Sequence, residues 1–284
     1  MAKAAEFTSH QLAYELIPDL CAAFERFIED GSDIDKTCAA KRAIARALYD
    51  LDYDSAAFWQ RYLNFRQLDP GYGEPVDSAV DVRCTCALGL VASGDPRAAL
   101  SLLELLHDSQ WQARLGAVRA LELVQPFHAE IALRHKILHG DEEPEVTAQC
   151  FSSLAKAAPE ESVPFIESFL RGHDHATREG AALALGETRL DEALDLLIGA
   201  TDDLFPSDPV LETFYRAIAL HRGERAYEYL LNKIATASER EAIPAAAALS
   251  IYSYNQGLKD QVTAIAKSRR IRRLSDVLKS HWED

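Results

Sequence analysis

The chain has 284 residues, of which 48% are hydrophobic and 26% charged, a composition typical of a folded globular protein. Its formal net charge of −15 repels the phosphates of nucleic acids and of anionic membranes, which disfavours both as partners and favours a protein partner, in particular a basic one. Five cysteines, an N-terminus without a signal-peptide pattern, and no apolar run long enough to cross a membrane favour a reduced, cytoplasmic protein.

The amino-terminal segment begins a pattern that runs through almost the whole chain. Apolar residues recur at positions i, i+3, i+4 and i+7, and alternating runs of β-branched residues are absent, which predicts an all-α fold. Within residues 1–35 this spacing includes Leu12, Leu16, Leu20 and Phe24. We therefore expect residues 1–35 to form a capping helix or helix pair at the end of a helical array.

Residues 58–65 contain clustered aromatic side chains, and residues 67–77 follow with the sequence QLDPGYGEPVD. Two prolines and two glycines in that segment forbid a continuous helix. On one interpretation the aromatic side chains face the core and residues 67–77 only connect two helices. On the other, this insertion protrudes and contacts a partner, because binding residues concentrate on loops held by rigid scaffolds. The second interpretation makes Trp59, Tyr62 and Tyr72 candidate partner-binding residues.

An internal repeat covers residues 36–266. Seven anchor positions are each followed by small or apolar residues three, six and seven places on; after Arg114 these are Ala117, Ala120 and Leu121. The anchors are residues 41, 83, 114, 147, 178, 211 and 242. They are 31 or 33 residues apart, except for a first step of 42 that holds the 67–77 insertion. Small residues at fixed offsets let neighbouring helices approach closely, so the repeat predicts an α-solenoid (superhelix) of about seven helix pairs.

Each predicted pair consists of an inner helix, which carries the anchor, and an outer helix. An aspartate precedes four of the inner helices, and we expect it to cap the helix N-terminus. These aspartates are Asp108, Asp141, Asp174 and Asp208. At the other end of the chain, residues 267–284 are basic and predict a C-terminal cap helix. The expected organisation is therefore a single domain over residues 1–284.

The polar residues on the inner helices are the other candidate binding positions, because inner helices line the concave face of a helical solenoid. They form a surface of mixed charge that lacks the aromatic lining of a small-molecule pocket and the single-sign stripe of a nucleic-acid binder. Such a surface suits a peptide or protein partner. The candidates are Arg42, Arg46, Arg119, Gln149, Glu179, Glu212 and Arg216.

The sequence contains no nucleotide-binding glycine loop, no nucleophile-elbow motif and no zinc-protease motif, so we predict no catalytic residue and no cofactor. His135 and His139 share a helix face, but histidines in successive repeats are too far apart to converge on one metal ion. Cys84 and Cys86 point away from each other on a helix, as buried structural cysteines would. We therefore predict no metal site either.

The pattern Arg-x-x-Ala-x-x-Ala-Leu at Arg114 and Arg178, followed by Gly186, resembles HEAT repeats, and is similar to the subtype first described in phycobilisome lyases. The resemblance implies an α-solenoid over most of the chain. That family includes scaffolds, adaptors, chromophore lyase subunits and a few DNA glycosylases. Our leading hypothesis is a non-enzymatic scaffold or adaptor that uses the concave face and the 67–77 loop. A chromophore lyase-like or otherwise catalytic protein is the alternative, and the acidic charge makes a nucleic-acid binder the least favoured.

Overall fold

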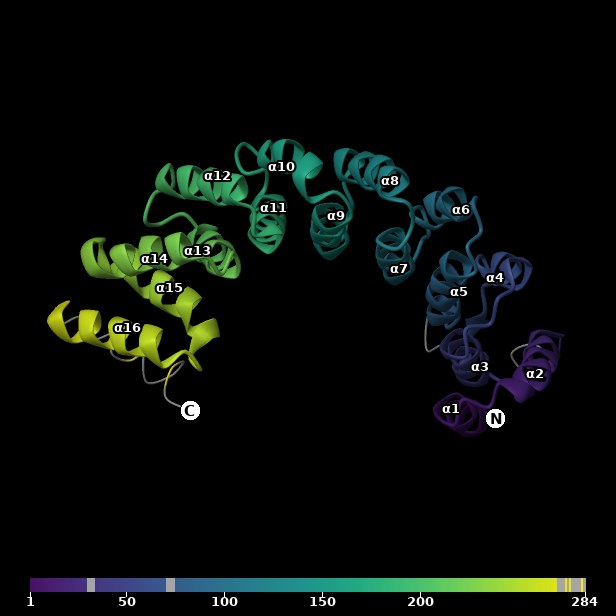
Figure 1. The fold of residues 1–284 in the computed structure, drawn as a ribbon. Coiled ribbons are helices and arrows are strands. Elements are labelled where there is room, and N and C mark those ends of the chain that lie inside the picture. The colour runs from purple at the N-terminus through teal and green to yellow at the C-terminus, as the bar shows by residue number, and fades with distance from the viewer. Residues whose placement is uncertain (30–33, 70–74, 270–273, 275, 277–281, 283–284) are drawn as a thin grey trace. The chain divides into compact units, whose positions relative to one another are not determined.

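A computed structural model describes the chain except for residues 30–33, 70–74, 270–273, 275, 277–281 and 283–284. The described part is built from α-helices (Figure 1) with one short two-stranded ribbon, which confirms the predicted all-α fold. The α-helices are α1 (Ala2–His10), α2 (Ile17–Glu29), α3 (Ala39–Asp50), α4 (Ala56–Tyr62), α5 (Val80–Ala92), α6 (Ala98–Leu105), α7 (Trp111–Leu121), α8 (Pro126–His139), α9 (Pro144–Ala157), α10 (Pro159–Glu167), α11 (His175–Thr188), α12 (Asp191–Asp202), α13 (Leu211–Leu220), α14 (Glu224–Thr236), α15 (Glu239–Leu249) and α16 (Gln256–Arg269). The short elements are the 3-10 helices η1 (Tyr14–Leu16) and η3 (Ser250–Tyr252) and the strands β1 (Leu68–Asp69) and β2 (Val76–Asp77). Within the described residues, no helix is long and apolar enough to cross a membrane.

The chain divides into two compact units, Met1–Val146 and Thr147–Asp284, and each is described by itself. In the first unit, α1, α3, α5 and α7 pack side by side in chain order, and α2, α4, α6 and α8 cover one side of that layer (Figure 1). The anchors Lys41, Arg83 and Arg114 lie on α3, α5 and α7, so the predicted helix pairs are confirmed here. The pair α1 and α2 occupies the predicted amino-terminal cap.

The second unit repeats the same arrangement. Helices α11, α13 and α15 pack in chain order, α10, α12 and α14 cover them, and α16 packs against α14. The anchors 178, 211 and 242 lie on the inner helices, as predicted. Helix α16 ends at Arg269, and most of the predicted cap helix over residues 267–284 lies outside the described residues.

Burial follows the repeat offsets throughout the chain. In every repeat, the residues three, six and seven places after the anchor are buried, as Ala117, Ala120 and Leu121 are after Arg114. The small residue is needed where two inner helices come closest. At Gly186 on α11, a Cβ atom would collide with the backbone carbonyl of Ala217 on α13. The small residues of the repeat therefore mark the positions where neighbouring inner helices approach each other most closely.

Buried or partly buried ion pairs join the arginine anchors to the aspartates that precede the inner helices. Arg83 lies 3.0 Å from Asp108 and Arg114 lies 2.6 Å from Asp141, so each anchor reaches the aspartate before the next inner helix. A longer pair of 3.7 Å joins Arg178 to Asp208. The Asp174 side chain caps α11 by accepting a hydrogen bond from the Thr177 amide at 3.0 Å.

The other three aspartates differ from the predicted caps. Asp108, Asp141 and Asp208 accept a hydrogen bond from the amide two residues ahead, at 2.8, 2.9 and 3.1 Å, in the turn before the helix. The same carboxylates also pair with the anchor of the preceding repeat. They therefore tie consecutive repeats together, a role that the sequence pattern did not predict.

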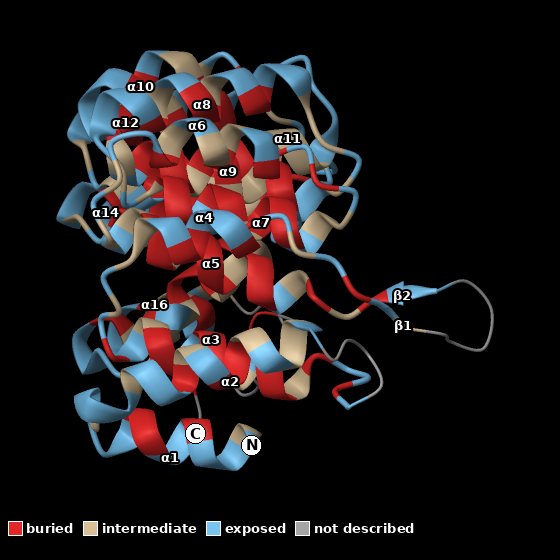
Figure 2. Cartoon of the chain, turned by 90° about the vertical axis from the view of Figure 1, so that its right-hand side faces the viewer, coloured by how far each residue is buried: buried red, intermediate tan, exposed pale blue. Residues whose placement is uncertain are grey.

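The 67–77 insertion forms the base of a β-hairpin, where we expected an irregular loop. Strands β1 and β2 pair antiparallel, with Leu68 opposite Asp77, and extend away from the helices (Figure 2). Buried polar contacts fix this register. The Gln67 amide nitrogen Nε2 donates to the Asp35 carbonyl at 2.8 Å, and Asp77 pairs with Arg83 at 2.8 Å. The hairpin is thus anchored in the same ion-pair system as the inner helices.

Candidate functional site

A groove of about 510 Å³ lies on the inner helices of the first unit, lined by residues of α1, α3 and α5; we call it the inner groove. Its floor contains the partly exposed side chains of Ala39 and Ala43 on α3, together with Leu88 on α5. Alanines on the open side of α3 leave room for another chain to approach the helix backbone. The groove walls are polar and charged, formed by Glu6, Ser9, His10, Arg42, Arg46, Asp50 and Asp81.

Two exposed ion pairs line the inner groove, one between α3 and α5 and one within α3. Arg42 Nη1 lies 3.0 Å from Asp81 Oδ2, and Arg46 Nε lies 2.9 Å from Asp50 Oδ1. The arginine side chains are 55% and 60% exposed. Exposed pairs of this kind contribute only about 0–1 kcal/mol each, because water solvates the separated charges well. A partner can therefore replace either member of these pairs at little free-energy cost.

One of the residues that line the inner groove is a cysteine. Cys84 contributes the thiol that lines it. Burial and the neighbouring Asp81 carboxylate raise the pKa of this thiol to about 11. At neutral pH the side chain is therefore a protonated thiol, and the thiolate that acts as a nucleophile is scarce.

The remaining predicted inner-helix residues lie on the helices expected of them. Arg119 is exposed on α7, the next inner helix of the first unit. In the second unit, Gln149 and Glu179 are partly exposed on α9 and α11, and Glu212 and Arg216 are exposed on α13. The structure thus brings Arg42 and Arg46 together in one groove. For all seven of these residues, binding to a partner stays a prediction.

Trp59 and Tyr62 require a correction, because both are buried, at 0% and 3% exposure. Trp59 Nε1 donates to the Tyr53 carbonyl at 3.0 Å, and Tyr62 packs edge-on against Phe24 of α2 with ring centroids 4.9 Å apart. The aromatic cluster is therefore part of the core, the first of our two interpretations, and these two side chains cannot meet a partner. The third candidate, Tyr72, lies outside the described residues.

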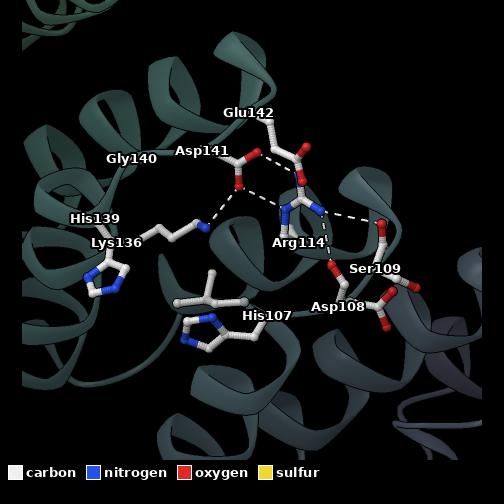
Figure 3. Close-up of a pocket in the computed structure, with 10 residues that line it drawn as sticks. His107, Asp108, Ser109, Arg114, Lys136, His139, Gly140, Asp141 and Glu142 are labelled. Carbon is white, nitrogen blue, oxygen red and sulfur yellow. Dashed lines mark hydrogen bonds and ion pairs between the residues drawn. The ribbon is translucent and has the colours of Figure 1, made fainter.

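A second pocket, of about 490 Å³, lies at the edge of the first unit where α6, α7 and α8 meet their turns (Figure 3). The carboxylate of Asp141 accepts from Arg114 Nε at 2.8 Å and pairs with Lys136 Nζ at 2.9 Å. Burial alone would raise the pKa of this carboxyl group, but the hydrogen bonds from Arg114 and Lys136 outweigh burial and lower it to about 2. His107 and His139 line the same pocket.

The sequence pattern did not lead us to predict this second pocket, although the sequence contains a signal for it. The basic anchor Arg114 precedes its aspartate by 27 residues, and Arg83 precedes Asp108 by 25 residues. An arginine that is followed by an aspartate after nearly one repeat length, in two successive repeats, indicates a contact between repeats. Because Asp141 already binds both Arg114 and Lys136, an incoming anion would have to compete with it. The charged residues of this pocket therefore stabilise the packing of successive repeats.

Metal ligation finds no support among the described residues, in which no group of three or more His, Cys, Asp or Glu side chains is arranged to hold an ion. His135 and His139 stack on each other with ring centroids 5.0 Å apart. Stacked rings direct their nitrogens side by side, whereas two ligands of one metal ion must converge on a point.

Comparison with known families gives one match. Residues 131–206 match the family model of HEAT repeats, whereas a comparison with curated proteins finds no similar sequence. Proteins built from HEAT repeats are generally interaction scaffolds and are typically non-catalytic. The likeness to the phycobilisome-lyase subtype stays a resemblance. The match supports a HEAT-repeat family for this chain, and helix pairs in the same layered arrangement precede and follow the matched residues.

Proposed function

We propose that the protein is a non-enzymatic interaction scaffold that holds a segment of a partner protein in the inner groove. The observation that carries the proposal is the combination of an alanine floor with walls of exposed, weakly paired charges. A peptide backbone can lie against Ala39 and Ala43, because their side chains are small and partly exposed. Its carbonyl groups can then accept hydrogen bonds from Arg42 and Arg46, whose guanidinium groups each carry several donors.

The charge of the protein favours a basic partner. The chain has a net charge of −15, and Glu6, Asp50 and Asp81 place carboxylates on the walls of the inner groove. A field of this sign attracts a basic protein over a distance and speeds its association. Lysine or arginine side chains of the partner can then pair with Asp50 and Asp81 once they displace Arg46 and Arg42.

The arms of the hairpin form the second part of the proposed surface. Leu68 and Val76 are each 62% exposed on an element whose base is fixed to the scaffold by buried polar contacts. An apolar side chain on a rigidly anchored projection is preorganised for binding, because little conformational entropy is lost when a partner covers it.

Reversing the acidic charges of the inner groove should strongly reduce partner binding. In the double variant Asp50→Lys/Asp81→Lys, we expect at least about tenfold less partner to be recovered, since like charges then face a basic segment. The measurement is quantitative affinity purification of the tagged full chain from its native cells. Asp54→Lys/Glu104→Lys is the matched control, because it changes the net charge equally at exposed sites outside the groove.

Two further variants locate the contact. Ala43→Trp should fill the groove floor and lower recovery without changing the charge, whereas Leu68→Ser/Val76→Ser reports on the hairpin arms. Equal recovery with the natural chain and with both inner-groove variants would contradict the proposal. It also fails if no protein co-purifies reproducibly and the groove binds only a small ligand.

The alternatives from the sequence have their own tests. A nucleic-acid binder should show an affinity that falls steeply as salt rises, which a gel-shift series detects directly. A chromophore lyase-like protein should colour a tetrapyrrole-bearing partner when the two are co-expressed. Neither result is expected from a scaffold of this charge.

A further inference from the structure

Helix α8 has an exposed apolar stripe on the side that faces away from the inner helices. Phe127, Ile131 and Leu138 are 69%, 53% and 70% exposed. Their spacings of four and seven residues place them on one face of the helix. The opposite face is also apolar, since Leu133 and Ile137 are buried in the first unit. Helix α8 therefore has more apolar surface than its own unit covers.

The neighbouring outer helix also has an exposed apolar side chain. Leu100 is 55% exposed on α6, which packs against α8. Scattered exposed leucines are ordinary on a protein surface, but large apolar side chains gathered on adjacent helices mark an interaction surface. This surface, which we call the α8 face, is separate from the inner groove, because its residues belong to the outer layer.

Polar residues flank the stripe differently on its two sides. A helix turns by about 100° per residue, which places Glu130 and Arg134 on one side and His128, His135 and His139 on the other. Glu130 and Arg134 form an ion pair at 2.6 Å. The α8 face thus has an apolar centre, one flank with both charge signs, and one flank of histidines.

We propose that the α8 face binds the α8 face of a second copy of this chain, with the two helices antiparallel about a two-fold axis. Positions 127 and 138 lie at equal distances from the midpoint between residues 132 and 133. An axis through that midpoint places Phe127 opposite Leu138 of the second copy and, by symmetry, Leu138 opposite Phe127. The two Ile131 side chains then fill the centre of the contact.

The charged flank supports the same axis. A two-fold axis perpendicular to both helices places the Glu130 flank of one copy beside the Glu130 flank of the second copy. Since positions 130 and 134 are symmetric about residue 132, Glu130 comes level with Arg134 of the second copy to within about 1.5 Å, the rise of one residue. The reciprocal pair forms on the other half. In a parallel pairing the two-fold axis would run along the helices and set the Glu130 flank of each copy against the histidine flank of the other, so the cross pair of Glu130 with Arg134 forms in the antiparallel arrangement only.

The contact is small, which sets the expected strength. A helix of 14 residues is about 21 Å long, and interfaces at the low end of the size range are weak and reversible. We expect a dimer with a dissociation constant in the micromolar range. Sedimentation velocity of the full chain over about 1–100 µM should show its sedimentation coefficient rising with concentration.

Ile131→Asp should leave the full chain monomeric over the same concentrations, raising the dissociation constant by about thirtyfold or more, because it places an unpaired carboxylate at the centre of the contact. The side chain is exposed, so the fold should be unchanged, which circular dichroism verifies. Phe205→Asp is the matched control, because it adds the same charge at a side chain 77% exposed in the second unit, and it should dimerise normally.

A charge exchange tests the antiparallel register. Glu130→Arg alone should weaken the dimer about tenfold, and adding Arg134→Glu should restore most of the affinity, because the exchanged pair remains complementary across the axis. A natural chain that is monomeric throughout the concentration range overturns the proposal. So does an Ile131→Asp variant that dimerises like the natural chain, or a charge exchange that fails to restore what Glu130→Arg removes.

Discussion

Replacing Asp141 with alanine should lower the free energy of unfolding by about 3–5 kcal/mol, the range observed when one partner of a buried ion pair is removed. The Asp141 side chain is 2% exposed and binds two cations, Arg114 and Lys136, whose own side chains are 7% and 10% exposed. Without the carboxylate, both cations remain buried without their counter-charge. Urea denaturation of the full chain measures the change.

The matched control removes an exposed aspartate from a similar pair. Asp81 pairs with Arg42 at 3.0 Å, but the two side chains are 60% and 55% exposed, so Asp81→Ala should cost at most about 1 kcal/mol. Equal losses for the two variants would contradict the argument, since burial is what separates the two pairs.

The stabilisation of the folded protein by Asp141 should also decrease as the pH falls. The pKa of this carboxyl group is lowered from 3.8 to about 2 in the folded protein, because the bonds from Arg114 and Lys136 outweigh burial. Since the unfolded chain binds this proton more readily, the stabilisation is present above about pH 4 and is lost as the pH falls toward 2. The difference in stability between the natural chain and Asp141→Ala should therefore narrow between pH 4 and pH 2.

The repeat was predictable because its signal is local. Close approach of two helices demands a small residue at a fixed distance from the anchor, so Ala120 and Gly186 mark the packing directly in the sequence. The pair Arg114 and Asp141 escaped prediction for the opposite reason. Its members are separated by 27 residues, and an aspartate before a helix already has a sufficient explanation as a cap.

The candidate site was predictable in part. Helical periodicity placed Arg42 and Arg46 on the open side of α3, where the structure has them. The contribution of α1 was missed, because residues 1–35 were interpreted as a cap, whereas Glu6 and Ser9 form one wall of the inner groove. Helix α1 does not share the repeat pattern, so nothing in the sequence indicates that it packs beside α3.

Trp59 shows why aromatic residues on an outer helix were ambiguous. Phe58 and Tyr62 share one helix face, and periodicity predicted that face as buried. Trp59 lies on another face, which would be exposed if α4 packed against a single layer. In the structure α4 is covered on two sides, because Phe24 of α2 contacts Phe58 and Tyr62 while Trp59 reaches Gly89 on α5.

Trp59→Ala should therefore act on stability, lowering the free energy of unfolding by about 3–5 kcal/mol, as expected when a fully buried aromatic side chain leaves a cavity. The tryptophan also explains why residue 89 is glycine. A Cβ atom at Gly89 would collide with the indole ring, so Gly89→Ala alone should cost about 1–3 kcal/mol through overpacking.

The two substitutions should be strongly coupled, because the cavity left by Trp59→Ala accepts the added methyl group. In a double-mutant cycle measured by urea denaturation, Gly89→Ala should cost little in the Trp59→Ala background, giving a coupling energy of about 1 kcal/mol or more. Additive effects would show that the indole does not pack on Gly89. A Trp59→Ala variant with unchanged stability and reduced partner recovery would place the side chain at an interface, which its complete burial between α4 and α5 argues against.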